Sequence, residues 1–295
     1  MYEIISLIKR NIKIYLRDPL AVFFSFLSTI ILMFIYIMFL GDVGGAELSA
    51  LLSPGELDLL IYSNMMAGVI VLNTLTIPLG NLGTIISDFE YNRMNAFMVT
   101  PVKRYKIILG YYFASLLITL TFSLMIWWLA SIVLGLVTGI FYTFSTVITV
   151  SGLIVVFVFI STSFMILLTT FIKSVNAFGA VSGIFGSIIG FVSGIYIPLT
   201  SSSPSVLRHI SSVVPFTHMT LKLKEILLKP SLDIVYAKTN GNAEAVANIR
   251  DGFGGQPIGL LGMDMSLTLL LILAGIVSIL VLIYSSYRLN KRIKA

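Results

Sequence analysis

The chain has 295 residues, of which 57% are hydrophobic and only 11% are charged, and its mean hydropathy is +1.01. Because soluble domains contain about 45–50% apolar residues, this composition excludes a soluble protein and predicts a membrane protein. The net charge of +6 is explained by membrane topology and by attraction to anionic lipid, without a nucleic-acid partner, and the lack of cysteine excludes disulfides and thiol chemistry.

The first residues predict an amphipathic helix. Residues 2–16 place isoleucine and leucine side chains on one side of a helix and Lys9, Arg10 and Lys13 on the other, a pattern typical of a helix lying in the inner headgroup region. An ordinary flanking anchor is the alternative. The apolar run that follows Asp18 is too long for the core of a cleaved signal peptide, so we expect this segment to stay attached.

Six apolar segments are long enough to cross a hydrocarbon core of about 30 Å at 1.5 Å per residue. They contain no ionisable side chain, and their length is not that of the alternating strands of a membrane barrel. The sequence therefore predicts one all-α transmembrane domain over residues 1–295 with spans at about 20–40, 61–86, 107–135, 144–172, 177–198 and 266–287.

The distribution of positive charge predicts the orientation. Thirteen of the 19 Lys and Arg residues lie at the termini or in the loops after the second and fourth spans, and the other six lie in the long loop 199–265. Because short positive loops stay in the cytoplasm, we expect both termini to be cytoplasmic and this loop to be extracellular. Trp127 and Trp128 lie near the outer end of the third span. We interpret them as interface anchors in preference to residues that stack on a substrate.

A charged island at residues 87–106 interrupts the apolar chain. Asp88 can cap a helix that begins at Phe89, and Pro101 stops it, which predicts a cytoplasmic helix over about 88–99. Apolar side chains such as Phe97 lie among the charges. They indicate either a contact with a protein partner, rimmed by polar groups, or an interfacial loop whose aromatic side chains enter the lipid.

Several functions are disfavoured by what the sequence lacks. The spans hold no ionisable residue of the kind that forms proton relays, although a sodium site of carbonyls and hydroxyls would leave no such mark. His209 and His218 lie in no metal or nucleophile motif. There is no G-x-x-x-x-G-K-[ST] phosphate loop, so any ATP-driven step needs another polypeptide.

The island also carries a resemblance to a known family. The run "SDFEYNRMNAFMVTPVKRYKIILGYYFASLL" resembles the stretch E-x-E-x-G-T-x-x-x-L-x-x-[ST]-P-[VI] of permease subunits in type-2 ABC exporters, a group that includes drug, lipid and O-antigen exporters. Asp88 and Glu90 match the acidic positions and Phe97 the apolar one, whereas Asn92 and Arg93 replace the glycine and the threonine.

Two further stretches carry the same resemblance. "FVSGIYIPLTSSSPSVLRHISSVVPFTHMTLKLKEIL" is similar to the S-G-x-x-x-P … P … P-x-[ST] region that follows the fifth span, and "YLRDPLAVFF" is similar to the entry into the first span. Their order along the chain agrees with the family's six-span layout.

The resemblance implies how the protein is assembled and driven. In that family the helix between spans two and three is a coupling helix that rests in a groove of an ATPase subunit, and two permeases pair with two ATPases. ATP and Mg would then belong to the ATPase, and this chain would bind no cofactor or metal and have no enzyme activity of its own. The residues implied in coupling are Asp88, Glu90, Arg93, Phe97 and Pro101.

The transport path is indicated less directly. Glycines recur every three or four residues in the fifth span, from Gly179 to Gly194, which lets another helix approach closely. That helix belongs either to the same subunit or, as the family's architecture implies, to a second copy beside the pathway. The polar residues of the second span do not fall on one face. The predicted pathway and interface residues are Asn73, Thr76, Gly183, Gly186, Gly190 and Gly194.

The loop 199–265 is the remaining large feature. Its first part is apolar, and the resemblance implies short re-entrant helices before the last span that form an outer gate, with Pro198, Pro215 and Phe216 as gate residues. Its second part is polar and glycine-rich, and Asn242 can cap a short helix there. We interpret this second part as a small extracellular cover.

These features together predict the permease subunit of an ATP-driven exporter in the plasma membrane. We expect a homodimer that moves a hydrophobic or amphipathic substrate, a drug or a membrane-active peptide, out of the cell. The alternatives are a polysaccharide or lipid exporter of the same family, an ion-coupled carrier without an ATPase, and a membrane-embedded sensor or immunity protein.

Overall fold

The computed structural model describes residues 2–35, 45–100, 102–261, 263 and 265–294, and over these residues the protein is all-α. The helices are α1 (Tyr2–Leu16), α2 (Pro19–Ile35), α3 (Gly45–Leu51), α4 (Pro54–Glu90), α5 (Met94–Met98), α6 (Arg104–Thr138), α7 (Phe144–Thr169), α8 (Val175–Val192), α9 (Ser205–Val213), α10 (Pro215–Leu227), α11 (Lys229–Lys238), α12 (Ala243–Gly252) and α13 (Leu267–Lys294).

Among the described residues, five helices are long and apolar enough to cross a membrane, namely α4, α6, α7, α8 and α13. They correspond to the second to sixth predicted spans and confirm a polytopic α-helical membrane protein. The predicted first span, 20–40, falls partly on α2 and partly on residues 36–40, which lie outside the described residues. The total of six spans therefore stays a prediction.

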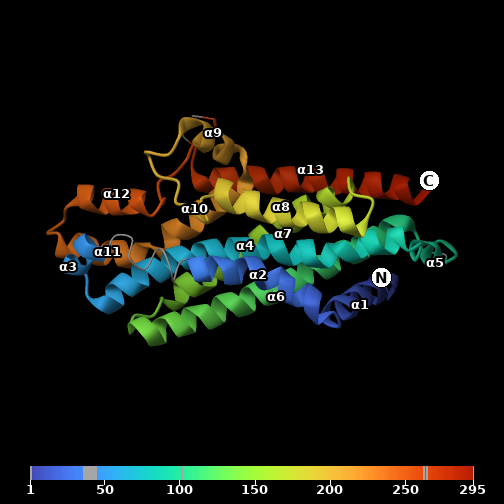
Figure 1. Cartoon of the computed structure of the whole chain (residues 1–295), viewed down its shortest axis with the longest axis horizontal. Helices are drawn as coiled ribbons and strands as arrows, with labels where there is room; N and C mark the ends of the chain where they lie inside the picture. The colour runs from blue at the N-terminus through green and yellow to red at the C-terminus, as the bar shows by residue number, and fades with distance from the viewer. Residues whose placement is uncertain (1, 36–44, 101, 262, 264, 295) are drawn as a thin grey trace.

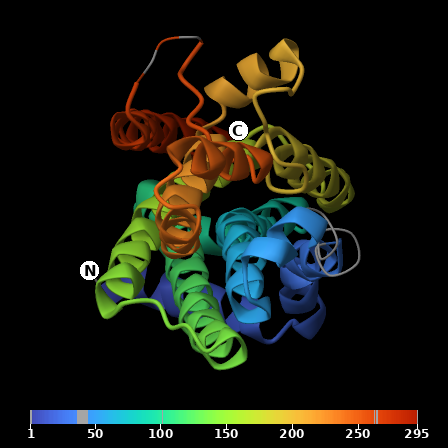
Figure 2. The same ribbon diagram turned by 90° about the vertical axis from the view of Figure 1, so that its left-hand side faces the viewer.

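Helix α4 forms the centre of the bundle. It contacts α2, α6, α7, α8 and α10, and 83% of its most apolar stretch is buried, compared with 22% in α8 and α13. Seen along the bundle, α8 and α13 lie on one side of α4 and α6 on the other (Figure 2). With 37 residues, α4 is about 55 Å long at 1.5 Å per residue. It is therefore longer than a hydrocarbon core of about 30 Å and extends beyond it.

The N-terminal helix begins and ends as predicted, over Tyr2–Leu16, but it packs against protein. Its buried positions are Leu7, Asn11 and Tyr15, spaced four residues apart on one face. A Cβ at Gly110 of α6 would lie 2.7 Å from Leu7 Cβ, so the glycine allows α1 to approach α6 closely. A displacement of α1 would therefore be transmitted to α6.

The two ends of the bundle differ. Both termini and α5 lie at one end, called the α5 end, whereas α3, α11 and α12 lie at the other, called the α12 end (Figure 1). At the α12 end, Asn242 Oδ1 accepts the amides of Glu244 (3.0 Å) and Ala245 (3.1 Å), which confirms the predicted cap.

The interpretation of Trp127 as an interface anchor is wrong. Its ring is fully buried, and its indole N–H donates to the Val147 carbonyl of α7 at 3.1 Å. The neighbouring Trp128 is exposed, as an anchor requires, and donates to Ser151 Oγ at 3.2 Å. The sequence of α6 could not show that α7 covers one ring and leaves the other free.

Candidate functional site

The predicted helix over 88–99 is divided in the structure. Helix α4 continues through Asp88 to Glu90, a turn follows, and α5 covers only Met94–Met98. Asn92 has φ +55°, a left-handed conformation that asparagine tolerates better than most residues. It stands where the family pattern has glycine, so the departure in sequence keeps the same kind of backbone turn. Asp88 is therefore not a helix cap, and Pro101 lies outside the described residues.

Asp88 is instead the centre of a buried polar cluster at the α5 end. Its side chain is 3% exposed, and Oδ2 accepts Arg10 Nη2 of α1 at 2.8 Å and the Tyr111 hydroxyl of α6. Arg93 Nη1 lies 3.8 Å from Oδ1. Because a buried carboxylate is costly unless paired, this carboxylate fixes α1 and α6 to the end of α4.

Glu90 makes a second internal connection. Its Oε2 accepts the backbone N–H of Val175 at 2.6 Å, the first residue of α8. A negative charge at a helix N-terminus is stabilised by the free amides and the helix dipole. The two acidic positions of the predicted coupling motif thus connect the turn after α4 to three helices, α1, α6 and α8.

The other predicted coupling residues divide into covered and exposed groups. Phe97 is half-buried against the main core, and the Arg10 guanidinium carbon lies 5.1 Å from its ring centroid. Arg93 is 60% exposed and lies over the Tyr91 ring, and Val99 is 87% exposed. The surface that this region presents outward therefore includes Tyr91, Arg93 and Val99, and Phe97 has a partner within its own chain.

A cavity of about 470 Å³ lies between α2, α4 and α8. Three predicted pathway residues line it: Thr76, Gly183 and Gly186. None of the described residues in its wall is charged, and the wall combines apolar side chains with the hydroxyls of serines and a threonine. The other lining residues are Ala21, Phe24, Ser25, Leu27, Ile31, Leu79, Gly80, Phe178, Gly179, Ser182 and Ser187.

The glycine stripe of α8 has two parts. At Gly179, Gly183 and Gly186, no atom of the described residues outside the local helix lies within 4 Å of the position a Cβ would take, so this part faces open space rather than a neighbouring helix of the same chain. A Cβ at Gly190 would clash with the Tyr196 ring, and Gly194 has φ +68° in the turn after α8. These last two glycines serve local packing and do not line the cavity.

The wall of the cavity is held by contacts between α2 and α4. Asn73 is buried beside the cavity wall, and its Oδ1 accepts the Thr29 hydroxyl of α2 at 2.8 Å. One side of Gly80 is filled by Ser25, so a Cβ at that position would clash with Ser25 Oγ. Asn73 therefore positions α2 and is not itself among the lining residues.

The predicted gate residues occupy different environments. Phe216, the second residue of α10, is buried and packs edge-on against Phe164 of α7 with ring centroids 5.9 Å apart. Pro215 is the first residue of α10. Pro198 faces the turn after α12, where a Cβ at Gly254 would lie 3.0 Å from Pro198 Cα. In this conformation Phe216 is a core residue, and only Pro198 borders a contact between segments that could separate.

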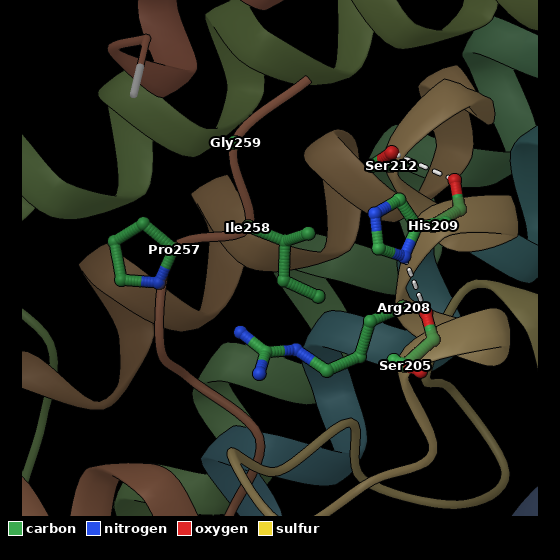
Figure 3. Close-up of a pocket in the computed structure, with 7 residues that line it drawn as sticks. All are labelled: Ser205, Arg208, His209, Ser212, Pro257, Ile258 and Gly259. Atoms are coloured by element: carbon green, nitrogen blue, oxygen red, sulfur yellow. Dashed lines mark hydrogen bonds between the residues drawn. The ribbon is translucent and has the colours of Figure 1, made fainter. Parts of the chain in front are cut away.

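A smaller cavity of about 280 Å³ lies between α9 and residues 257–259 (Figure 3). His209 Nδ1 pairs with the Ser205 carbonyl at 2.7 Å, and the Ser212 hydroxyl donates to the His209 carbonyl at 2.7 Å and not to its ring. The serine and the histidine therefore form no nucleophile and base pair. No cluster of His, Cys, Asp and Glu able to hold a metal occurs among the described residues.

Sequence reasoning missed three residues that the structure makes prominent: Arg10 and Tyr111, the partners of Asp88, and Lys224, a fully buried lysine of α10. For Lys224 a signal existed, since it shares one helical face with Leu221 and Leu228. Arg10 gave no signal, because its partner is 78 positions away along the chain.

The fold and the site define a class: a polytopic α-helical membrane protein with an uncharged cavity between its helices and a turn at one end that is bonded to three of them. The ABC-2 type transporter family matches residues 2–228, and the chain belongs to that family. It is a transmembrane permease subunit of an ABC transporter, and its family implies an ABC ATPase partner. The sequence matches no individual curated protein.

Proposed function

We propose that this permease exports a hydrophobic or amphipathic molecule, a drug or a membrane-active peptide, across the plasma membrane. The observation that carries the proposal is the uncharged cavity between α2, α4 and α8. Its volume of about 470 Å³ lies within the range of about 300–1,000 Å³ of small-molecule sites. An ionic solute would have no charged partner in this wall, and burying an unpaired charge is costly.

The hydroxyl groups of the wall suit a substrate with a few polar atoms. Ser187 lines the cavity and is exposed; its hydroxyl donates to the Gly183 carbonyl at 3.0 Å, and its oxygen can still accept a hydrogen bond from a bound molecule. A lipid exporter is the second candidate, because the exposed apolar faces of α2 and α8 give a lipid chain lateral access. A long hydrophilic glycan is less suited to these apolar side chains.

The proposed assembly contains two permeases and two ATPases. The open face of α8 at Gly179, Gly183 and Gly186 suits a second copy of the permease across the cavity, since small residues allow close helix contact. The excess of Lys and Arg near the termini and around α5 supports a cytoplasmic position for the α5 end, where the ATPase would bind.

Coupling to the ATPase is proposed to pass through the turn after α4. Tyr91, Arg93 and Val99 form the exposed docking surface, and Asp88 and Glu90 carry its displacement to α1, α6 and α8. A stiff element tied to several helices is what such transmission requires. Because α8 lines the cavity, a movement of Glu90 changes the cavity wall directly.

The experiment is a substrate screen on the complex of permease and copurified ATPase in nanodiscs. We expect hydrophobic drugs or amphipathic peptides to stimulate ATP hydrolysis, and we expect Ser182→Leu, which fills the cavity, to abolish that stimulation without lowering basal hydrolysis. Gly152→Leu on the exposed face of α7 is the control. Stimulation by a long hydrophilic glycan alone would contradict the proposed substrate class.

A further inference from the structure

Lys224 of α10 lies where three segments meet. It is 1% exposed, and its Nζ donates to the Phe253 carbonyl at 2.8 Å and to the Gly194 carbonyl at 3.4 Å. Phe253 follows α12, and Gly194 follows α8. One buried amine thus bonds both the turn after the cavity-lining helix and the turn that leads from α12 toward α13.

The contact between these two turns, called the seam, is tight. Gly194 has φ +68° and Gly254 has φ +61°, conformations in which glycine is strongly favoured. A Cβ at Gly254 would lie 2.7 Å from the Leu199 backbone nitrogen, and one at Gly194 would lie 2.9 Å from Leu199 Cγ. The seam therefore closes backbone against backbone, with Leu199 buried inside it.

Among the described residues, no acidic partner neutralises this lysine. Lys224 is in none of the five ion pairs found among the described residues. On its own helix, Lys222 pairs with Glu225 at 2.9 Å, and on α12 Asp251 bonds Ser201 instead. The other titratable or charged groups on the elements packed around α10 are Glu56, Asp58, Tyr62, Asp88 and Glu90 of α4, Tyr284, Tyr287, Arg288 and Lys291 of α13, and Tyr196, Arg208, His209, His218, Lys229, Asp233, Tyr236, Lys238, Glu244 and Arg250.

The number of donors matches a neutral amine. Two N–H groups meet two carbonyls, whereas an ammonium has a third donor and a charge that burial does not favour. Burial lowers the pKa of Lys224 from 10.5 to about 7, because the charged form loses its water. In the closed seam the neutral form is therefore accessible near neutral pH, whereas an exposed lysine would be charged.

We propose that Lys224 is a positioning residue of the transport cycle: its neutral amine latches the turn after α12 onto the end of α8, and protonation of the amine releases that turn. The inference rests on the proposed function in one respect, since it makes the seam the closing surface of the outer gate that the family resemblance implies for an exporter. In this proposal Lys224 is the gate residue, in place of the predicted Phe216.

The direction of the pH effect follows from the two forms of the seam. The open form, with Lys224 in water, binds a proton below about pH 10.5, and the closed form does so only below about pH 7. Between these values each unit of falling pH favours the open form by up to about tenfold. Below about pH 7 both forms are charged, and the ratio stops changing.

The test uses the fact that the chain contains no cysteine. Leu199→Cys places a thiol inside the seam, and Ser202→Cys places one on the exposed connection nearby. Both are labelled with a water-soluble maleimide in nanodiscs, and the ratio of their rates at each pH removes the intrinsic pH dependence of the thiol. We expect this ratio to fall by up to about 100-fold from pH 7 to pH 9, at about tenfold per unit.

Variants at Lys224 identify the group that titrates. With Lys224→Met the ratio should no longer depend on pH. With Lys224→Arg, which stays charged, it should be independent of pH and high. The matched control Lys222→Met should keep the slope of the wild type. Monodisperse elution of each variant shows that it folds.

The latch would be overturned by an unchanged slope in Lys224→Met, or by a wild-type ratio that is flat, including one that is flat because the buried thiol is never labelled. The labelling requires neither substrate nor ATPase. A flat ratio together with drug-stimulated ATP hydrolysis would reject the latch and keep the proposed function. A normal slope without any such stimulation would keep the latch and reject the proposed function.

Discussion

Replacing Asp88 by asparagine tests whether the acidic motif is an internal connection or a docking group. The side chain keeps its size but loses the charge that pairs with Arg10 at 2.8 Å. Removing one partner of a buried ion pair costs about 3–5 kcal/mol, and a hydrogen bond to a charged group contributes about 1.5–3 kcal/mol. Because the Arg10 side chain is 30% exposed, water stabilises part of its unpaired charge, and we expect the folded state to lose about 2 kcal/mol of stability.

The assay is equilibrium unfolding of the purified permease without its ATPase. A loss of about 2 kcal/mol of stability raises the equilibrium constant of unfolding by about 30-fold, in favour of the unfolded state. The matched variant is Arg93→Ala, whose side chain is 60% exposed and 3.8 Å from the same carboxylate. An exposed pair contributes only about 0–1 kcal/mol, so Arg93→Ala should unfold almost like the wild type.

Asp88→Asn should have the larger effect on unfolding, whereas Arg93→Ala should have the larger effect on ATPase binding. Arg93 lies on the proposed docking surface, so Arg93→Ala should weaken the complex while leaving the permease stable. If Asp88→Asn leaves the unfolding free energy unchanged and instead weakens ATPase binding, the carboxylate faces the partner and the internal connection to α1 and α6 is refuted.

The remaining predictions concern the cavity, the α8 terminus, Lys224 and the ATPase. Gly186→Leu should fill the open face of α8 and abolish export with little effect on folding, because no atom of the described residues outside the local helix lies within 4 Å; export assays and elution profiles check this against Gly152→Leu. Glu90→Gln should cost about 0.3–1 kcal/mol of stability and reduce substrate stimulation of ATP hydrolysis. The unfolding free energy of the wild type should rise from pH 7 to pH 9, because the unfolded chain binds the Lys224 proton that the folded chain lacks, and Lys224→Met should remove that rise. The permease purified alone should hydrolyse no ATP, as a malachite green phosphate assay will show.

Features that depend on local sequence were predictable. The helix over Tyr2–Leu16 follows from its amphipathic spacing, and the centres of the long helices follow from apolar runs bounded by charge or glycine. The cap at Asn242 was likewise visible, because it depends on residues only two or three positions away.

Features that depend on distant partners were not predictable. The position of Asp88 in the sequence predicts a helix cap. In the structure it lies in the last turn of α4 and is the buried hydrogen-bond partner of Arg10 and Tyr111. The same reason applies to Trp127, whose partner is a carbonyl of α7. The cavity depends on the distance between α2 and α8, and no periodicity in the sequence reports a distance between helices.

The most direct test of the proposed function is ATP-dependent transport in liposomes that contain the permease and its copurified ATPase. A fluorescent hydrophobic dye is added on the ATPase side, and its appearance on the other side is followed with the wild type and with Gly186→Leu. We predict ATP-dependent accumulation with the wild type and none with Gly186→Leu, although both complexes hydrolyse ATP at the basal rate. Equal accumulation with both would contradict a pathway through the cavity between α2, α4 and α8.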